Sequence, residues 1–369
     1  MNRMKLGEIL SVKHGWAFKG EYFAEDGEQS ILTPGNFFEK GGFKPNNGKE
    51  RYYTGTYPKE YLCHKGDLIV AMTQQAEGLL GSTALVPEDN KYLHNQRIGL
   101  ITCDEKRLNK LFAYYLFMTK SVREQLERSS SGTKVKHTSP EKIYDVEVEI
   151  PDVISQQKIA NLLWSIDEKI ANNNAINDNL EQQMHLIFEN MMAKAATLKL
   201  SGEYTIAQNL ATVVTGKEDA NFSVPNGKYK FFTCSNTPLS CDEYVFDSSS
   251  ILIAGNGDFN VKHYSGKFNA YQRTYVLTPD KKYFGLLYLA SLYRINSFKS
   301  RSSGSIVKFI TKSDVENIPV FIPNDRFYLQ ELNKLIYLQE QNKLENELLV
   351  NLRDWLLPML MNGQATISD

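Results

Sequence analysis

The chain lacks the sequence motifs by which most enzymes and membrane proteins are identified. It has no Walker A loop and no GxGxxG, and its six histidines show no metal-ligand spacing. No apolar run approaches the length of a bilayer span, and the first residues do not form a signal peptide. We therefore expect neither a nucleotide-binding enzyme nor a membrane protein.

Cysteine is also scarce, and neither sign of charge dominates. The four cysteines form no CxxC pair, so we expect free thiols in a reducing cytosol. The 42 basic and 43 acidic residues nearly cancel, which argues against a uniformly basic nucleic-acid coat. Residues 1–150 and 200–323 are nevertheless slightly basic, and residues 294–312 contain five basic residues and no acidic one.

A heptad pattern of apolar residues occupies residues 159–191 without a glycine or proline. Spacings of three and four place these residues on one stripe, which is typical of a helix that packs along a partner helix. At about 1.5 Å per residue the helix would be about 50 Å long. The stripe turns polar at its centre, where Asn173 and Asn177 occupy heptad positions.

A second heptad pattern lies in a helix predicted over residues 329–361. It is also polar at its centre, at Asn342 and Glu345. If the helices pack antiparallel, Asn177 lies near Asn342, and the pair would fix the register; solvated positions are an equal alternative. Pro358 should kink or end the last turn. The predicted helix–helix and partner interface comprises Ile159, Leu163, Ile166, Ile170, Asn177, Leu180, Met184, Ile187, Leu335, Leu338, Asn342, Leu349, Leu352 and Leu356.

The chain contains an internal repeat. A shift of 172 residues superposes residues 132–151 on 304–323, and the same shift superposes 179–180 on 351–352. One offset that explains two separate stretches indicates a tandem duplication of a domain followed by a helix. In the first domain, residues 31–33, 68–71 and 98–101 have strand-like composition, and one helix is predicted over residues 108–126.

The residues around the first helix resemble a known family. Residues 150–151, 156–160, 162–163, 166–170 and 179–180 read IP, QQKIA, LL, IDEKI and NL. This run resembles the spacer of the DNA specificity subunit of Type I restriction-modification systems. The second copy departs from the pattern, with Tyr328-Leu329 in place of Gln156-Gln157.

The resemblance implies an α+β fold. Two similar β-rich target-recognition domains would be separated by two long antiparallel helices, as a pseudo-two-fold tandem repeat. The implied boundaries are residues 1–151 and 200–323 for the recognition domains, 152–199 for the central spacer helix and 324–369 for the C-terminal spacer helix.

The resemblance also implies a noncatalytic cytoplasmic subunit whose domains each read one half of a split site on double-stranded DNA. The helices would hold two methylation subunits, with restriction subunits in the full complex. An adenine methyltransferase would need an Asn- or Asp-Pro-Pro-aromatic motif, and the 12 prolines are never adjacent. We therefore expect no cofactor in this chain and a methyl donor on the methylation subunits.

Candidate DNA contacts are loop residues where Lys, Arg, Asn and Gln mix with aromatics, because cations bind phosphates and amides read base edges. They are Lys44, Asn46, Asn47, Lys49, Arg51, Gln74, Gln75, Lys134, Lys136, Lys228, Lys230, Asn256, Lys299, Arg301 and Lys308. Each could equally be a solvated surface residue. Arg97 and Arg273, which both follow glutamine, could equally make internal ion pairs.

Two other function classes stay open. A stand-alone DNA-modifying enzyme would transfer methyl groups without a partner, although its motifs are missing. A coiled-coil adaptor that binds only proteins would explain the helices but not two similar domains, and salt-dependent DNA binding would exclude it. Apolar residues outside the heptad frame, namely Leu162, Phe188 and Leu348, suggest that a methylation subunit packs on the helices.

Overall fold

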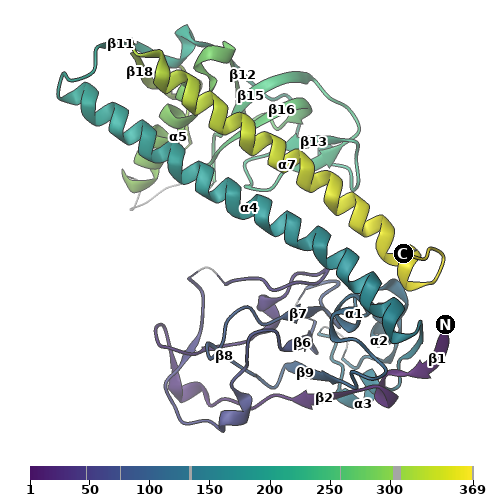
Figure 1. Cartoon of the computed structure of the whole chain (residues 1–369). Coiled ribbons are helices and arrows are strands. Elements are labelled where there is room, and N and C mark those ends of the chain that lie inside the picture. Colours follow the sequence, from purple (N-terminus) through teal and green to yellow (C-terminus); the bar gives the residue numbers. More distant parts are fainter. Residues whose placement is uncertain (47, 75, 133–134, 258, 302–308, 368–369) are drawn as a thin grey trace. The chain divides into compact units, whose positions relative to one another are not determined.

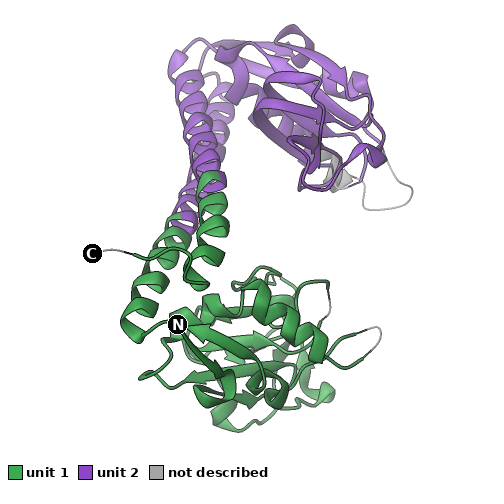
Figure 2. Cartoon of the chain, turned by 90° about the vertical axis from the view of Figure 1, so that its right-hand side faces the viewer, with its two compact units in different colours: residues 1–169, 348–369 green, residues 170–347 purple. Residues whose placement is uncertain are grey.

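The computed structural model describes residues 1–46, 48–74, 76–132, 135–257, 259–301 and 309–367, except for the side chains of residues 297–301. The chain divides into two compact units (Figure 2): unit 1 comprises residues 1–169 and 348–369, and unit 2 comprises residues 170–347. Each unit contains a β-rich domain and part of the two long helices α4 (Val153–Ala196) and α7 (Arg326–Met361). No described helix is both long and apolar enough to cross a membrane.

Unit 1 contains two four-stranded sheets and a two-stranded ribbon. The first sheet has the order β2 (Leu10–His14), β9 (Ile98–Cys103), β6 (Leu68–Ala71), β7 (Thr83–Leu85), and the second has the order β3 (Phe23–Ala24), β5 (Tyr52–Tyr53), β4 (Ser30–Ile31), β8 (Tyr92–Leu93). The ribbon pairs β1 (Asn2–Lys5) with β10 (Glu147–Ile150). All four residues of β6 are buried, because its apolar side chains alternate between the two faces of the first sheet and both faces are covered.

The helices of the unit 1 domain are α1 (Lys110–Leu116), α2 (Lys120–Ser129) and α3 (Pro140–Tyr144). The prediction of one helix over residues 108–126 was wrong, because Thr119 caps α2 and separates it from α1. Arg123 compensates for the break, since its Nε donates to the Phe117 carbonyl at 2.6 Å. Burial lowers the pKa of Arg123 to about 10.

Unit 2 contains one six-stranded sheet and a second ribbon. The order of the sheet is β12 (Ala211–Thr215), β17 (Thr274–Pro279), β15 (Phe246–Ala254), β16 (Val261–Ala270), β13 (Tyr229–Phe232), β14 (Leu239–Cys241). The ribbon pairs β11 (Gly202–Ile206) with β18 (Pro319–Pro323), and the remaining helices are α5 (Phe284–Arg301) and α6 (Lys312–Glu316). β16 pairs with both β15 and β13, so one continuous sheet stands where unit 1 has two.

The tandem repeat predicted from the 172-residue shift is confirmed. The shift places α3 on α6 and their capping residues Ser139 and Thr311 on each other, and it places β10 on β18. The order β2-β9-β6-β7 in unit 1 also matches β12-β17-β15-β16 in unit 2. The two domains therefore share the topology of this four-stranded part.

The helices α4 and α7 lie side by side and antiparallel (Figure 1). In unit 2, Asn342 Nδ2 donates to Asn177 Oδ1 at 2.9 Å, and Asn173 Nδ2 donates to Glu345 Oε2 at 2.7 Å. The predicted meeting of the two polar centres is thus confirmed. Of the other predicted interface residues, Ile159, Leu163, Ile166, Leu180, Met184 and Leu335 are buried, and Ile170, Ile187, Leu349 and Leu356 are half-buried.

The predicted frame of α7 differs from the structure at two positions. Leu338 and Leu352 are exposed, and the following residues, Gln339 and Arg353, contact α4 instead. Gln339 Nε2 donates to Glu181 at 3.0 Å in unit 2, and Arg353 Nη1 pairs with Asp167 at 2.7 Å in unit 1. Polar side chains hold these positions because an acidic residue of α4 faces each of them. α7 ends at Met361, within one turn of Pro358.

A side-chain amide ties each domain to one of the long helices. In unit 1, the amide of buried Gln156 donates to a carbonyl before α1 at 3.0 Å and accepts from the Asn109 N–H at 2.9 Å. Tyr328 occupies the equivalent position in α7, and Asn333 supplies the amide instead. It donates to a carbonyl before α5 at 2.9 Å and accepts from the Gly285 N–H at 2.8 Å. The second copy therefore departs from the spacer pattern but keeps the contact.

Candidate nucleic-acid interface

A cleft of about 490 Å³ in unit 1 brings together three of the residues predicted to contact DNA, Asn46, Lys49 and Arg51. We call it the unit 1 cleft. Its other polar lining includes Asn95, Gln96 and Arg97, which the pairing of β4 with β8 brings near. No acidic residue is among the lining residues described. Cations suit phosphates, and amides and arginine suit base edges, so the cleft has the chemistry of a DNA contact.

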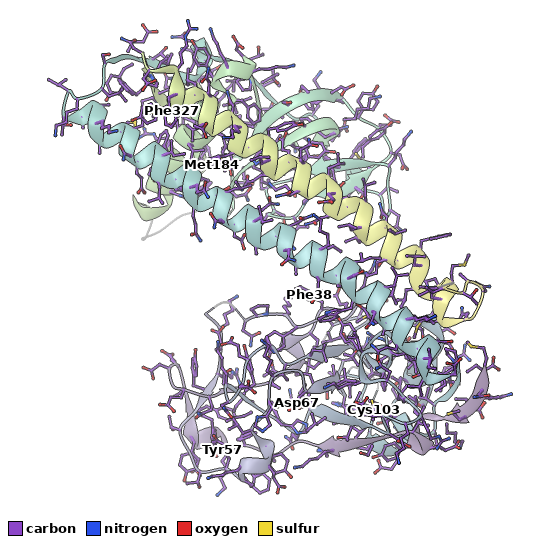
Figure 3. All side chains as sticks on the ribbon, viewed as in Figure 1. Phe38, Tyr57, Asp67, Cys103, Met184 and Phe327 are labelled. Carbon is purple, nitrogen blue, oxygen red and sulfur yellow. The ribbon has the colours of Figure 1, made fainter. Side chains whose placement is uncertain are left out.

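Buried Asn36 positions the loop that carries two of the candidates. Its Nδ2 donates to the Lys44 carbonyl at 3.3 Å, and its Oδ1 accepts from the Thr33 N–H at 2.8 Å. Asn46 Nδ2 reaches the same oxygen at 3.5 Å. The Lys44 ammonium lies 5.8 Å from the ring of exposed Phe38 (Figure 3), outside the cleft.

Two aromatic rings, Phe18 and Phe23, line the unit 1 cleft, and tyrosine rings pack behind them. Phe18 lies edge-on to Tyr53 at 4.8 Å and to Tyr57 at 6.4 Å, and Phe23 lies edge-on to Tyr53 at 6.2 Å (Figure 3 labels Tyr57). Phe23 is also exposed. The ring cluster makes a stiff apolar surface beside the cations, which suits contact with sugars or a thymine methyl group.

Gln74 and Lys136, which were also predicted to contact DNA, do not line this cleft. The Gln74 N–H donates to the Lys136 carbonyl at 2.9 Å, so the two residues are adjacent. Lys136 is ion-paired with Glu127, and Gln74 lines a different cavity of about 540 Å³ whose lining includes four acidic residues. Four basic residues also line that cavity, so its lining has no net positive charge to attract phosphates.

Six of the predicted contacts lie wholly or partly outside the part of the chain that the structure describes. Asn47, Gln75, Lys134 and Lys308 lie outside the described residues. Lys299 and Arg301 lie in the last turns of α5, and their side chains are outside the described part. Asn256 is half-buried in the turn after β15.

In unit 2, two lysines flank a pair of tyrosine rings. Tyr229 and Tyr244 are 4.9 Å apart, the Lys228 ammonium lies 5.4 Å from the first ring, and the Lys267 ammonium lies 4.7 Å from the second. Sequence reasoning missed Lys267, because the ring beside it is distant in the sequence. Lys230, by contrast, is ion-paired with a carboxylate of α7, Glu347, at 3.0 Å.

Arg97 and Arg273 make no ion pair with any residue in the part of the chain that the structure describes. Each is exposed in the turn that precedes a strand, β9 or β17. The sequence could have indicated them, because the dipeptide Gln-Arg occurs in both halves before a strand-like run.

The histidine beside the unit 1 cleft is structural. His94 is fully buried, and its Nε2 donates to the Ile98 carbonyl at 2.8 Å. Burial lowers the pKa of His94 to about 4, so the ring is neutral at pH 7. Within the described residues, no group of three or more His, Cys, Asp or Glu side chains could hold a metal ion.

The chain matches one family of known proteins in sequence and in fold. A family model described as "Type I restriction modification DNA specificity domain" matches residues 1–182 and 210–351. The chain is 36% identical over 164 residues to the EcoDI specificity subunit of Escherichia coli, a match that covers 42% of this chain and 37% of that protein. It is 22% identical over 304 residues to the MjaIX specificity subunit of Methanocaldococcus jannaschii, which covers 70% of this chain and 69% of that protein.

A further match, to the MjaVIII specificity subunit of M. jannaschii, is 23% identical and covers 45% of this chain and 39% of that protein. The matched regions thus span less than two thirds of the EcoDI and MjaVIII subunits. The crystal structure of the Type-I restriction-modification S subunit from M. genitalium has the same fold. It aligns with a TM-score of 0.62 at 18% identity and covers 100% of this chain and 96% of that chain.

Proposed function

We propose that this chain, which belongs to the Type I restriction modification DNA specificity family, is the sequence-specific DNA-binding subunit of a restriction-modification complex. It reads a bipartite site on double-stranded DNA and has no catalytic site of its own. The observation that carries this proposal is the tandem repeat, because four strands of each domain have the same order and each domain is joined to a long helix. Two copies of one reader suit a site of two separate halves.

We assign the two readers to residues 1–151 and 200–323, and the spacer helices to residues 152–199 and 324–369. In the first reader, Lys44, Asn46, Lys49 and Arg51 contact DNA at and beside the unit 1 cleft. This assignment is supported by a lining that combines cations and amides with no described carboxylate. In the second reader, Lys228 and the adjacent tyrosine pair have matching chemistry.

The helices bind two methylation subunits, and the full complex adds restriction subunits. This is supported by the unit 1 part of α7, where Leu348, Leu352 and Trp355 are exposed at spacings of four and three residues and so share one stripe. Phe188 does not contribute to such a surface, because it is buried in the core of unit 2. The methyl donor binds the methylation subunits. The complex acts in the cytoplasm, where its DNA substrate is found.

Salt-dependent DNA binding by the full chain tests this function. We expect the logarithm of the binding constant to fall linearly with the logarithm of salt concentration, because phosphate contacts release counterions. The double variant K49A/R51A should reduce that slope by about 1.8, which corresponds to two lost contacts. K59A/K65A, which removes two exposed lysines of the same domain that lie outside the cleft, is the matched control. A chain that binds its methylation partner but no DNA would be an adaptor.

A further inference from the structure

We propose that Arg97 and Arg273 are equivalent phosphate-binding residues, one in each domain, which hold the DNA backbone without reading bases. The proposal rests on the DNA-binding function above and names the chemical group that these two side chains contact. It derives from a backbone arrangement that the two domains share around a Gln-Arg dipeptide.

Both arginines occupy the same position of a hydrogen-bonded turn. The first turn closes where the Ile98 N–H donates to the Asn95 carbonyl at 2.9 Å, and the second closes where the Thr274 N–H donates to the Tyr271 carbonyl at 2.8 Å. The central residues of the two turns are the dipeptides Gln96-Arg97 and Gln272-Arg273. Turns favour glycine, proline, asparagine, aspartate and serine for backbone reasons, and neither glutamine nor arginine meets such a requirement. The shared dipeptide therefore calls for a role of its side chains.

The backbone on each side of the arginine is also held in the same way. The N–H of the preceding glutamine donates to the Trp16 carbonyl at 3.1 Å in unit 1 and to the Glu218 carbonyl at 2.9 Å in unit 2. The carbonyl of the arginine itself accepts from Met72 N–H at 3.0 Å and from Gly255 N–H at 2.8 Å. These two donors each directly follow the equivalent central strands β6 and β15. Each turn is thus tied to both neighbouring strands.

A glycine permits this close approach in each domain. A Cβ on Gly15, directly after β2, would lie 2.1 Å from the Asn95 carbonyl oxygen. A Cβ on Gly216, directly after the equivalent β12, would lie 2.1 Å from the Ala270 carbonyl oxygen. Both distances exclude any other residue without a backbone shift. The sequence therefore maintains a rigid platform under both arginines.

The guanidinium groups on these platforms are available. Both arginine side chains are exposed and have no hydrogen-bond acceptor among the described residues. Arg97 lines the unit 1 cleft with Lys49 and Arg51. In unit 2, the nearby carboxylate of Asp219 accepts from Gln272 Nε2 at 2.8 Å, so the glutamine and not Arg273 engages it. A planar fork of donors on a fixed backbone, with no partner among the described residues, suits a phosphate.

The duplication favours phosphate over base. The loops around the two turns differ in sequence, and two readers of a split site must distinguish different bases. A side chain that both readers place on the same backbone turn suits the part of DNA that does not vary with sequence, which is its backbone.

The test measures salt-dependent binding of the full chain to two labelled duplexes, one of mixed sequence and one that carries the site mapped from modified DNA. R97A and R273A should each weaken binding to both duplexes by about tenfold, as expected for a charge-assisted contact. Each should lower the log–log salt slope by about 0.9. The mapped site should stay unchanged. R97K should recover part of the slope that R97A loses, but it should bind less tightly than the unmodified chain.

The matched controls are K106A and K281A, which remove an exposed lysine shortly after the same two strands, β9 and β17. Arginine variants that equal these controls, while the unmodified chain binds DNA, would overturn the phosphate assignment and leave the proposed function intact. Relaxed preference at one base position would overturn it in favour of base reading. An unmodified chain without salt-dependent binding would refute the proposed function itself. Unchanged thermal midpoints would show that each variant is folded.

Discussion

The hydrogen bond between Asn177 and Asn342 can be tested by a double-mutant cycle. Asn177 is almost fully buried, and its side-chain oxygen accepts from Asn342 Nδ2 at 2.9 Å. Its backbone carbonyl accepts from Gln339 Nε2, and this second bond survives any side-chain substitution. Asn177→Leu therefore leaves one amide donor of Asn342 facing an apolar side chain. An unsatisfied buried polar group costs about 1–3 kcal/mol, and since Asn342 is only half-buried we expect about 1–2 kcal/mol.

Asn342→Leu alone should cost a similar amount, because it leaves the Asn177 oxygen unpaired. The double variant N177L/N342L removes both polar groups, so its free energy of unfolding should lie within about 0.5 kcal/mol of the unmodified chain. The coupling energy is then about 2–4 kcal/mol. Urea unfolding followed by circular dichroism, with hydrogen exchange of residues 170–182, measures it. Additive losses in the double variant would refute the reasoning.

Three further predictions concern pH, the amide contacts and the helices. The pKa of His94 is lowered by burial to about 4, so protonation favours the unfolded chain; stability should fall as pH drops below about 6.5, by about 2 kcal/mol at pH 5. His94→Gln should remove that loss in urea unfolding. Gln156→Ala should destabilise unit 1 by about 2 kcal/mol and Asn333→Ala should destabilise unit 2 similarly. Tryptophan fluorescence should detect only the former directly, because all three tryptophans belong to unit 1. Seven residues inserted after positions 174 and 346 preserve the heptad phase and add about 10 Å. The gap between half-sites should then lengthen by about three base pairs, and an unchanged gap in the mapped sites would contradict this.

Periodic features of the sequence were sufficient to predict much of the fold. The heptad pattern indicated α4, and the 172-residue shift indicated the repeated domain. The frame of α7 could not be predicted at Gln339 and Arg353, because a polar residue at a buried position depends on an acidic partner in another helix. The break before α2 depends likewise on Arg123, whose guanidinium donates to the carbonyl of Phe117, the residue directly after α1.

The candidate interface was less predictable, because it forms from distant segments. Lys49 and Arg51 line the same cleft as Arg97 only because short strands pair. The composition of these strands gives little indication that they are strands. By sequence, Lys230 is as good a candidate for a DNA contact as Lys228. The structure instead pairs its ammonium group with Glu347. For Arg97 and Arg273, the decisive information is that no internal partner is present among the described residues.

We propose that two domains of one chain each read one half of a DNA site, and exchanging one domain tests this claim. Residues 200–323 are replaced with the recognition domain of another specificity subunit, in cells that contain the complete system, and every methylated site is mapped by sequencing. We expect one half-site to change completely while the other half-site and the gap stay the same. Changes in both half-sites, or in neither, would contradict the claim.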